Sequence, residues 1–179
     1  MKIINWKNKK AVKVATEVIN RGGVMVYPTD TIYGFGVNAK DPKVIDKLNT
    51  IKNRKGPISV IAPDRDTVSN WLNVKEEEKL HAASHLNAQN TIIYQVKKNI
   101  VHKKIMGPNS TLGIRIPNHP FCKLIANSCN VPITTTSVNR TGEPPRNNVK
   151  QILNAFPTEI DLIIEDGDLI NSASKIYIY

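Results

Sequence analysis

Residues 24–39 read VMVYPTDTIYGFGVNA, and this stretch decides how the rest of the chain is interpreted. It begins with four apolar residues, 24–27, which predict a short buried strand. The next helix begins only at Asp41-Pro42, where a capping carboxylate precedes a proline. Between them lies Gly34-x-Gly36-x-x-Ala39, a loose match to the dinucleotide-binding fingerprint. The six residues PTDTIY separate the strand from these glycines and no acidic ribose ligand follows, so we reject a Rossmann site.

Helical and strand patterns alternate on both sides of this stretch. The apolar spacing predicts helices over residues 10–21, 42–51, 64–85 (with a break near 73), 120–128 and 147–156. It predicts strands over residues 24–27, 58–62, 91–96, 112–116, 132–136, 162–165 and 176–178. Such alternation is typical of an α/β domain in which helices pack on a sheet. With 179 residues and neither a repeat nor a linker, we expect a single domain over residues 1–179.

Composition excludes several classes of protein. Hydrophobic residues make up 40% of the chain and charged residues 22%, which excludes a disordered tail, a collagen-like fibre and a coiled coil. No apolar run approaches the ~18 residues that span a bilayer, and the opening MKIINWKNKK lacks the apolar core of a secretory signal. We therefore expect a cytoplasmic protein with no membrane partner, in which Cys122 and Cys129 are reduced thiols.

The charge is strongly positive and unevenly distributed. The chain carries 25 basic and 15 acidic residues, a formal net charge of +10. Residues 1–150 hold 24 of the basic and 10 of the acidic side chains, whereas residues 151–179 hold one basic and five acidic. Such a surface attracts polyanions, including RNA and nucleotide phosphates. Surplus lysines also keep a small protein soluble, so charge alone leaves both interpretations open.

Three polar features interrupt the apolar pattern. Arg115 lies inside the apolar strand at 112–116, and a threonine-rich strand runs into Ser137-x-Asn139-x-Thr141-Gly142. The loop PTDT places two hydroxyl groups beside a carboxylate. An arginine at a strand end with hydroxyl neighbours is suited to hold a carboxylate or a phosphate. Lys52-x-Arg54-Lys55 follows the second helix, where cations are ordinary, but beside the other features it favours an anion site.

Two other patterns favour ordinary structural roles. His81-x3-His85 could place two imidazoles on one helix face for a metal, but no third ligand is evident and a solvated pair is the better interpretation. The acidic stretch EDGD at 165–168 is interpreted as a solvated turn. We predict no metal site from the protein side chains.

Four motifs occur in a fixed order: Gly23-x3-Tyr27-Pro28-Thr29-Asp30-Thr31-x-Tyr33-Gly34, Lys52-x-Arg54, Gly113-Ile114-Arg115-Ile116-Pro117-x-His119-Pro120 and Thr136-Ser137-x-Asn139-x-Thr141-Gly142-Glu143-Pro144. Together they resemble the YrdC/TsaC family of threonylcarbamoyl-AMP synthases over residues 10–178. This resemblance implies a twisted mixed α/β sheet with flanking helices and a basic concave face.

The resemblance also implies a reaction: L-threonine, bicarbonate and ATP would form threonylcarbamoyl-AMP and pyrophosphate. A partner threonylcarbamoyl transferase complex would then modify an adenosine in the tRNA anticodon loop (t6A). Carried over residue by residue, the catalytic set is Lys52, Arg54, Ser137 and Asn139. Threonine would bind at Thr31, Arg115, Ser137 and Ser174. ATP, accompanied by Mg²⁺, would bind at Lys52, Arg54, Thr111 and Asn139.

The sequence also departs from the family pattern. Asn87-Ala88-Gln89-Asn90-Thr91 stands where the family has Pro-Gly-Pro-x-Thr. Ser174-Lys175-Ile176-Tyr177 replaces a Ser-Thr-Val-Val element. These changes leave two alternatives open, namely a diverged member with an altered substrate and a non-catalytic module that binds tRNA or double-stranded RNA through its basic face.

Overall fold

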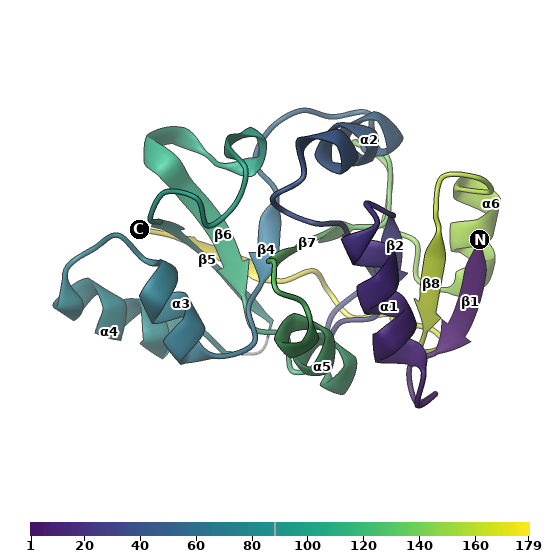
Figure 1. Cartoon of the computed structure of the whole chain (residues 1–179), viewed down its shortest axis with the longest axis horizontal. Helices are drawn as coiled ribbons and strands as arrows, with labels where there is room; N and C mark the ends of the chain where they lie inside the picture. The colour runs from purple at the N-terminus through teal and green to yellow at the C-terminus, as the bar shows by residue number, and fades with distance from the viewer. Residues whose placement is uncertain (88) are drawn as a thin grey trace.

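The structure is a computed structural model that describes residues 1–87 and 89–179; Ala88, in the stretch 87–91 noted above, lies outside the described residues. The described strands form a nine-stranded mixed sheet in the order β1-β8-β2-β3-β7-β4-β6-β5-β9 (Figure 1). The strands are β1 (Lys2–Asn5), β2 (Met25–Tyr27), β3 (Gly34–Gly36), β4 (Ser59–Ile61), β5 (Asn90–Gln95), β6 (Thr111–Arg115), β7 (Ile133–Ser137), β8 (Leu162–Glu165) and β9 (Lys175–Ile178). The helices are α1 (Ala11–Asn20), α2 (Pro42–Lys52), α3 (Arg65–Trp71), α4 (Glu76–His85), α5 (Pro120–Ser128) and α6 (Val149–Ala155), with short 3₁₀ turns at Lys103–Ile105 and Pro108–Ser110.

Parallel and antiparallel pairs are combined in this sheet. β1 and β2 pair in parallel with β8, as β4 does with β6 and β5 with β9. β3 is antiparallel to both β2 and β7, and β7 is antiparallel to β4. The expected mixed α/β sheet is therefore confirmed.

Helices cover both faces of the sheet, and successive residues of β2 show the division. Val26 belongs to one core, which also holds side chains of α2, α3 and α6. Met25 and Tyr27 belong to the other, which holds side chains of α1 and α5. Alternate strand residues point to opposite faces, so a strand buried on both sides has an unbroken apolar sequence. Figure 1 shows α1 and α5 on the viewer's side of the sheet.

The predicted helix boundaries agree with the capping groups. Asp41 accepts a hydrogen bond from the backbone N–H of Lys43 at 2.9 Å, and Pro42 occupies the first turn of α2. The predicted break near residue 73 separates α3 from α4. No helix of the described residues is long and apolar enough to cross a membrane.

Two strands, β1 and β3, were not predicted. β3 has the sequence Gly-Phe-Gly, and glycine has a low intrinsic preference for strands. Its place is fixed by pairing with β2 on one side and β7 on the other. β1 lies at the edge of the sheet and is mostly exposed, so it lacks a buried apolar pattern. Both strands are therefore determined by tertiary pairing rather than by local sequence.

On the face of the sheet that α5 covers, the side chains change from apolar to hydroxyl-bearing along β4 and β7. Ile61 and Ile133 are buried there, whereas Ser59 and Thr135, two residues away on the same strands, are paired with each other in register. A Cβ atom at Gly113 of β6 would lie 2.3 Å from Oγ of Ser59, so only glycine fits beside this hydroxyl. The sheet therefore carries small and hydroxyl side chains where it lines a cavity.

Candidate active site

A polar cavity of about 190 Å³ lies over these small residues. Eight of its 13 lining residues carry a hydroxyl group: Thr29, Tyr33, Ser59, Thr91, Thr135, Thr136, Ser137 and Ser174. Arg115 is the cationic side chain of the lining. Pockets for drug-sized ligands are typically about 300–1,000 Å³, so this cavity suits a smaller polar molecule with an anionic group.

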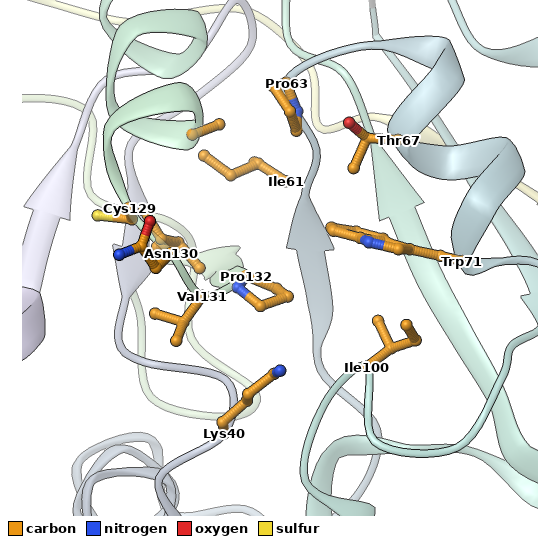
Figure 2. Close-up of a pocket in the computed structure, with 12 residues that line it drawn as sticks. Lys40, Ile61, Pro63, Thr67, Trp71, Ile100, Cys129, Asn130, Val131 and Pro132 are labelled. Carbon is orange, nitrogen blue, oxygen red and sulfur yellow. The ribbon is translucent and has the colours of Figure 1, made fainter.

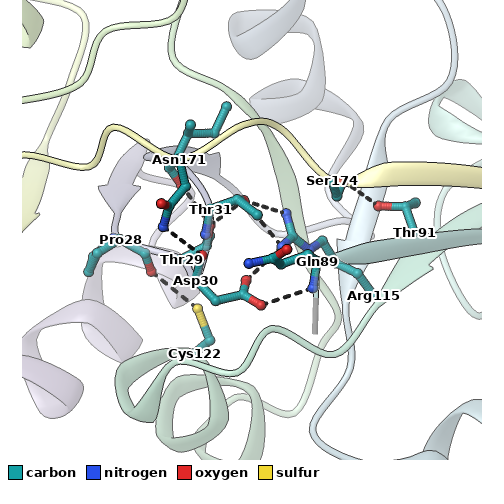
Figure 3. A network of polar contacts seen from close by, with 11 residues as sticks. Pro28, Thr29, Asp30, Thr31, Gln89, Thr91, Arg115, Cys122, Asn171 and Ser174 are labelled. Carbon is teal, nitrogen blue, oxygen red and sulfur yellow. Dashed lines mark hydrogen bonds and ion pairs between the residues drawn. The ribbon is translucent and has the colours of Figure 1, made fainter. Parts of the chain in front are cut away.

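Arg115, the last residue of β6, is 5% exposed. Its Nη2 donates to Oδ1 of Asp30 at 2.7 Å, and Nη1 and Nη2 donate to Oγ1 of Thr31 at 3.2 and 3.3 Å (Figure 3). Its Nε has no hydrogen-bond partner among the residues that the structure describes. A buried guanidinium with an unused N–H can accommodate one more oxygen acceptor.

Residues 166–174, here called the C-terminal strap, connect β8 to β9 and contribute Ala173 and Ser174 to the cavity lining. The side-chain amide of Asn171 donates to the backbone oxygen of Asp30 at 3.2 Å. The hydroxyl groups of Ser174 and Thr91 lie 2.8 Å apart (Figure 3). These contacts hold the strap beside Arg115.

Lys52, the last residue of α2, is buried with 2% exposure. Its Nζ donates to the backbone oxygens of Ser137 and Asn139 at 2.5 and 2.9 Å and to Oδ1 of Asn139 at 3.1 Å. An ammonium group has three protons, so all of them are used. In return, the backbone N–H and Oγ1 of Thr141 donate to the backbone oxygen of Lys52 at 2.9 and 3.1 Å. Two motifs far apart in the sequence thus form one hydrogen-bonded unit.

The charge on Lys52 is also unusual. Burial, and then the positive charge of Arg54, lower the pKa of Lys52 to about 8. Neither residue belongs to any of the ion pairs found within residues 1–87 and 89–179. Two neighbouring cations without a carboxylate partner create a local field that favours a polyanion.

Arg54 and Thr111 lie outside the lining of the polar cavity. Arg54 donates to the backbone oxygen of Pro57 at 2.8 Å and borders an open depression of about 860 Å³ that Lys55 and Lys104 also border. Thr111 begins β6, at the opposite end from Arg115, and its Oγ1 donates to the backbone oxygen of Pro108 at 2.8 Å.

The structure therefore divides the predicted site residues into groups. Arg115, Ser137 and Ser174 line the polar cavity, and Thr31 contacts Arg115 from beside it. Lys52 donates hydrogen bonds to both Ser137 and Asn139, which joins the three residues in the hydrogen-bonded unit. The structure gives the positions of these residues, while the roles assigned from the resemblance stay predictions.

Several lining or supporting residues were not among the predicted site residues, and they include Asp30, Ser59, Thr91 and Thr135. Asp30 carried a signal, since it is the carboxylate within PTDT. Thr135 also carried a signal, since it lies in the threonine-rich strand that leads to Ser137. Ser59 carried none, because a single hydroxyl in a short apolar strand resembles any half-buried position.

A second cavity of about 240 Å³ lies between α3 and α5, with Ile61 and Ile133 in its lining (Figure 2). Trp71 and Cys129 also line it, and Lys40 extends to its edge. Both Cys129 and Cys122 are buried free thiols whose pKa values are raised by burial. The expected reduced state of the cysteines agrees with this arrangement.

The histidine pair has protein partners. Nδ1 of His81 lies 3.0 Å from the hydroxyl of Tyr94, and Nδ1 of His85 lies 3.0 Å from the backbone oxygen of His81. Among the described residues, no group of three or more His, Cys, Asp or Glu side chains is arranged to hold a metal ion.

Comparison with known proteins gives consistent matches. A threonylcarbamoyl-AMP synthase of Hydrogenovibrio crunogenus is 32% identical over 93% of this chain and 91% of its own length. One from Coxiella burnetii is 28% identical over 87% of this chain and 85% of its own. These relatives match along nearly their whole length.

Solved structures show the same fold. A Pyrococcus abyssi Sua5 complexed with L-threonine superposes with a TM-score of 0.88 at 22% identity and covers 100% of this chain, which spans 54% of the Sua5 chain. YciO of Escherichia coli superposes with a TM-score of 0.87 at 21% identity, over 99% of this chain and 88% of its own. The model of the Sua5/YciO/YrdC family, described as "Telomere recombination", matches residues 17–177. The chain therefore belongs to the Sua5/YciO/YrdC family.

Proposed function

We propose that this protein is a threonylcarbamoyl-AMP synthase, which converts L-threonine, bicarbonate and ATP into L-threonylcarbamoyl-AMP, pyrophosphate and water. The names of its relatives support this activity. The bound L-threonine in a solved Sua5 supports threonine as the amino-acid substrate.

One observation carries the proposal: Ser137 joins two anion-binding environments. Ser137 lines the polar cavity together with Arg115. Its backbone oxygen accepts a hydrogen bond from Nζ of Lys52, whose neighbour Arg54 has no carboxylate partner among the described residues. An amino acid and a polyphosphate bound at these two places would be neighbours, as a reaction between them requires.

In this scheme Arg115 and Thr31 bind the carboxylate of threonine, because a guanidinium beside a hydroxyl offers several donors to one carboxylate. Ser137 and Ser174, which line the same cavity, would contact the threonine hydroxyl. A cavity of about 190 Å³ favours an amino acid of this size over a larger one.

The nucleotide would lie on the other side of Ser137. Arg54 faces the open depression and is the cation best placed for the phosphates, with Asn139 as a polar contact. Lys52 contributes positive charge from beneath the loop. Thr111 stands further away, at the start of β6, as a contact for the rest of the nucleotide. We propose that Mg²⁺ enters with ATP as part of the substrate, since it is commonly held by phosphate oxygens and water.

The reaction balances without a covalent enzyme intermediate. The threonine amine forms a C–N bond to the bicarbonate carbon, water leaves, and a carbamate results. A carbamate oxygen then attacks the α-phosphorus of ATP, and the bond to the departing pyrophosphate breaks with its electron pair. The cations stabilise the charge that develops on the phosphoryl oxygens, while the cavity supplies orientation.

The test is pyrophosphate release in the presence of ATP, Mg²⁺, bicarbonate and threonine. We expect release that falls to background when either threonine or bicarbonate is omitted. Pyrophosphate release that is unchanged when threonine or bicarbonate is omitted would contradict the proposal. Release that requires another amino acid in place of threonine would indicate the diverged enzyme, and RNA binding without any release would indicate the non-catalytic module.

We further propose that the product is passed to a threonylcarbamoyl transferase complex that modifies tRNA. ATP and tRNA are both cytoplasmic, so we propose the cytoplasm as its location. Contact with tRNA would use the basic residues that predominate over residues 1–150.

A further inference from the structure

Asp30 forms a buried ion pair with Arg115, and it is Arg115 that lines the polar cavity. Oδ1 of Asp30 lies 2.7 Å from Nη2 of Arg115, and the two side chains are 9% and 6% exposed. Charges this well shielded from water interact strongly, and each alters the field that a ligand in the cavity experiences.

Three further contacts keep the Asp30 carboxylate in place. Its second oxygen accepts the backbone N–H of Gln89 at 3.1 Å. Its backbone oxygen accepts the amide of Asn171 from the C-terminal strap at 3.2 Å. Thr31, the next residue, shares Arg115 with it (Figure 3). These contacts hold the carboxylate against the guanidinium.

This pairing changes what Arg115 can attract. An isolated buried guanidinium attracts any anion, including phosphate and simple carboxylates. With Asp30 attached, the pair is neutral, and an added carboxylate meets the negative charge of Asp30 as well as the positive charge of Arg115. A ligand that carries an ammonium group beside its carboxylate balances both.

We infer that Asp30 is a specificity-determining residue, which makes the Arg115 site accept a zwitterionic amino acid in preference to a simple carboxylate of the same shape. The inference rests on the proposed function and deepens it, because it explains how the threonine cavity excludes other small anions beside a strongly basic surface.

Calorimetric titration with two probes tests this. L-Threonine and (R)-3-hydroxybutyrate share a carboxylate and a 3-hydroxyl group, and only threonine has the amine. We expect the wild-type chain to prefer threonine by more than about tenfold. Asp30→Asn should weaken threonine binding, strengthen 3-hydroxybutyrate binding and reduce the ratio by about tenfold. Asp66→Asn, which removes the same charge from an exposed position in α3, should leave the ratio unchanged.

The outcomes separate the two proposals. If the wild type neither binds threonine nor releases threonine-dependent pyrophosphate, the proposed function fails. If it binds threonine and Asp30→Asn leaves the ratio unchanged, the function stands and the role of Asp30 is overturned. Equal affinity of the wild type for both probes also overturns it, and this result requires no variant to fold. Asp30→Glu, which keeps the charge, should retain the preference.

Discussion

At the scale of single residues, Lys52 illustrates how a structure refines a motif. The sequence identified it as one of two cations in Lys-x-Arg, and the resemblance assigned it to ATP. Its three protons are all directed to Ser137 and Asn139. Since two of these acceptors are backbone oxygens, no side-chain pattern could have revealed the arrangement.

Lys52 should leave a signature in the pH dependence of stability. Its pKa is about 8 in the folded chain, against an ordinary value of 10.5. Between these values the unfolded chain binds more protons, so the Lys52 contribution to the free energy of unfolding rises with pH and is lost as pH falls through 8. Lys52→Met should remove this rise.

Urea unfolding at half-unit steps from pH 7.5 to 10.5 would measure it. Other lysines and tyrosines also titrate in this window, so the comparison needs a matched control. Lys55→Met alters an exposed lysine three residues away and should follow the wild-type profile. Parallel profiles for wild type and Lys52→Met would refute the assignment.

The predicted residues of the candidate site were all assigned from the resemblance to the family. Arg115, Ser137 and Ser174 were carried over from motifs and lie around one cavity. Arg54 and Thr111 came from the same source and lie apart from it. Asp30 was visible within PTDT, but its pairing with Arg115 joins positions 85 residues apart, which spacing alone does not reveal.

At the scale of elements, the apolar pattern predicted most helices and strands because each has its own buried face. α5, predicted over 120–128, has the bounds Pro120–Ser128. β3 was missed because its two glycines have no side chains to pack, and its neighbours β2 and β7 determine its course. The elements that can be predicted are therefore those whose own sequence shows the apolar pattern of a buried face.

The close contact of β4 with β6 gives a direct test at this scale. In Gly113→Ala the new Cβ would lie 2.3 Å from Oγ and 3.0 Å from Cβ of Ser59, so the Ser59 side chain must rotate or the strands must shift. We expect a loss of about 1–3 kcal/mol in the free energy of unfolding. Thermal or urea denaturation would measure it.

Ser59→Ala supplies the second half of a double-mutant cycle, because it removes the hydroxyl that the new methyl group meets. Gly113→Ala should cost less in the Ser59→Ala background than in the wild type. Equal costs in both backgrounds would show that the contact does not limit this position.

At the scale of the whole molecule, the charge asymmetry concerns any RNA partner. Residues 1–150 carry 24 basic and 10 acidic side chains, and residues 151–179 carry one and five. If the basic part contacts at least two tRNA phosphates, the affinity for tRNA should fall by about tenfold between 50 and 200 mM salt. Filter binding at several salt concentrations would measure this, and an affinity that does not vary with salt would exclude a phosphate-directed contact.

The order of the strands has a consequence for how the molecule forms. β1 pairs with β8 in the register Lys2↔Leu162, so its neighbour among the described strands lies some 160 positions later. During synthesis on a ribosome, β1 can therefore pair with β8 only after some 160 further residues have been made. The lining of the polar cavity is completed later still, because Ser174 follows β8 in the chain. Termination before Ser174 would thus yield a chain with most of its basic residues but without the complete polar cavity.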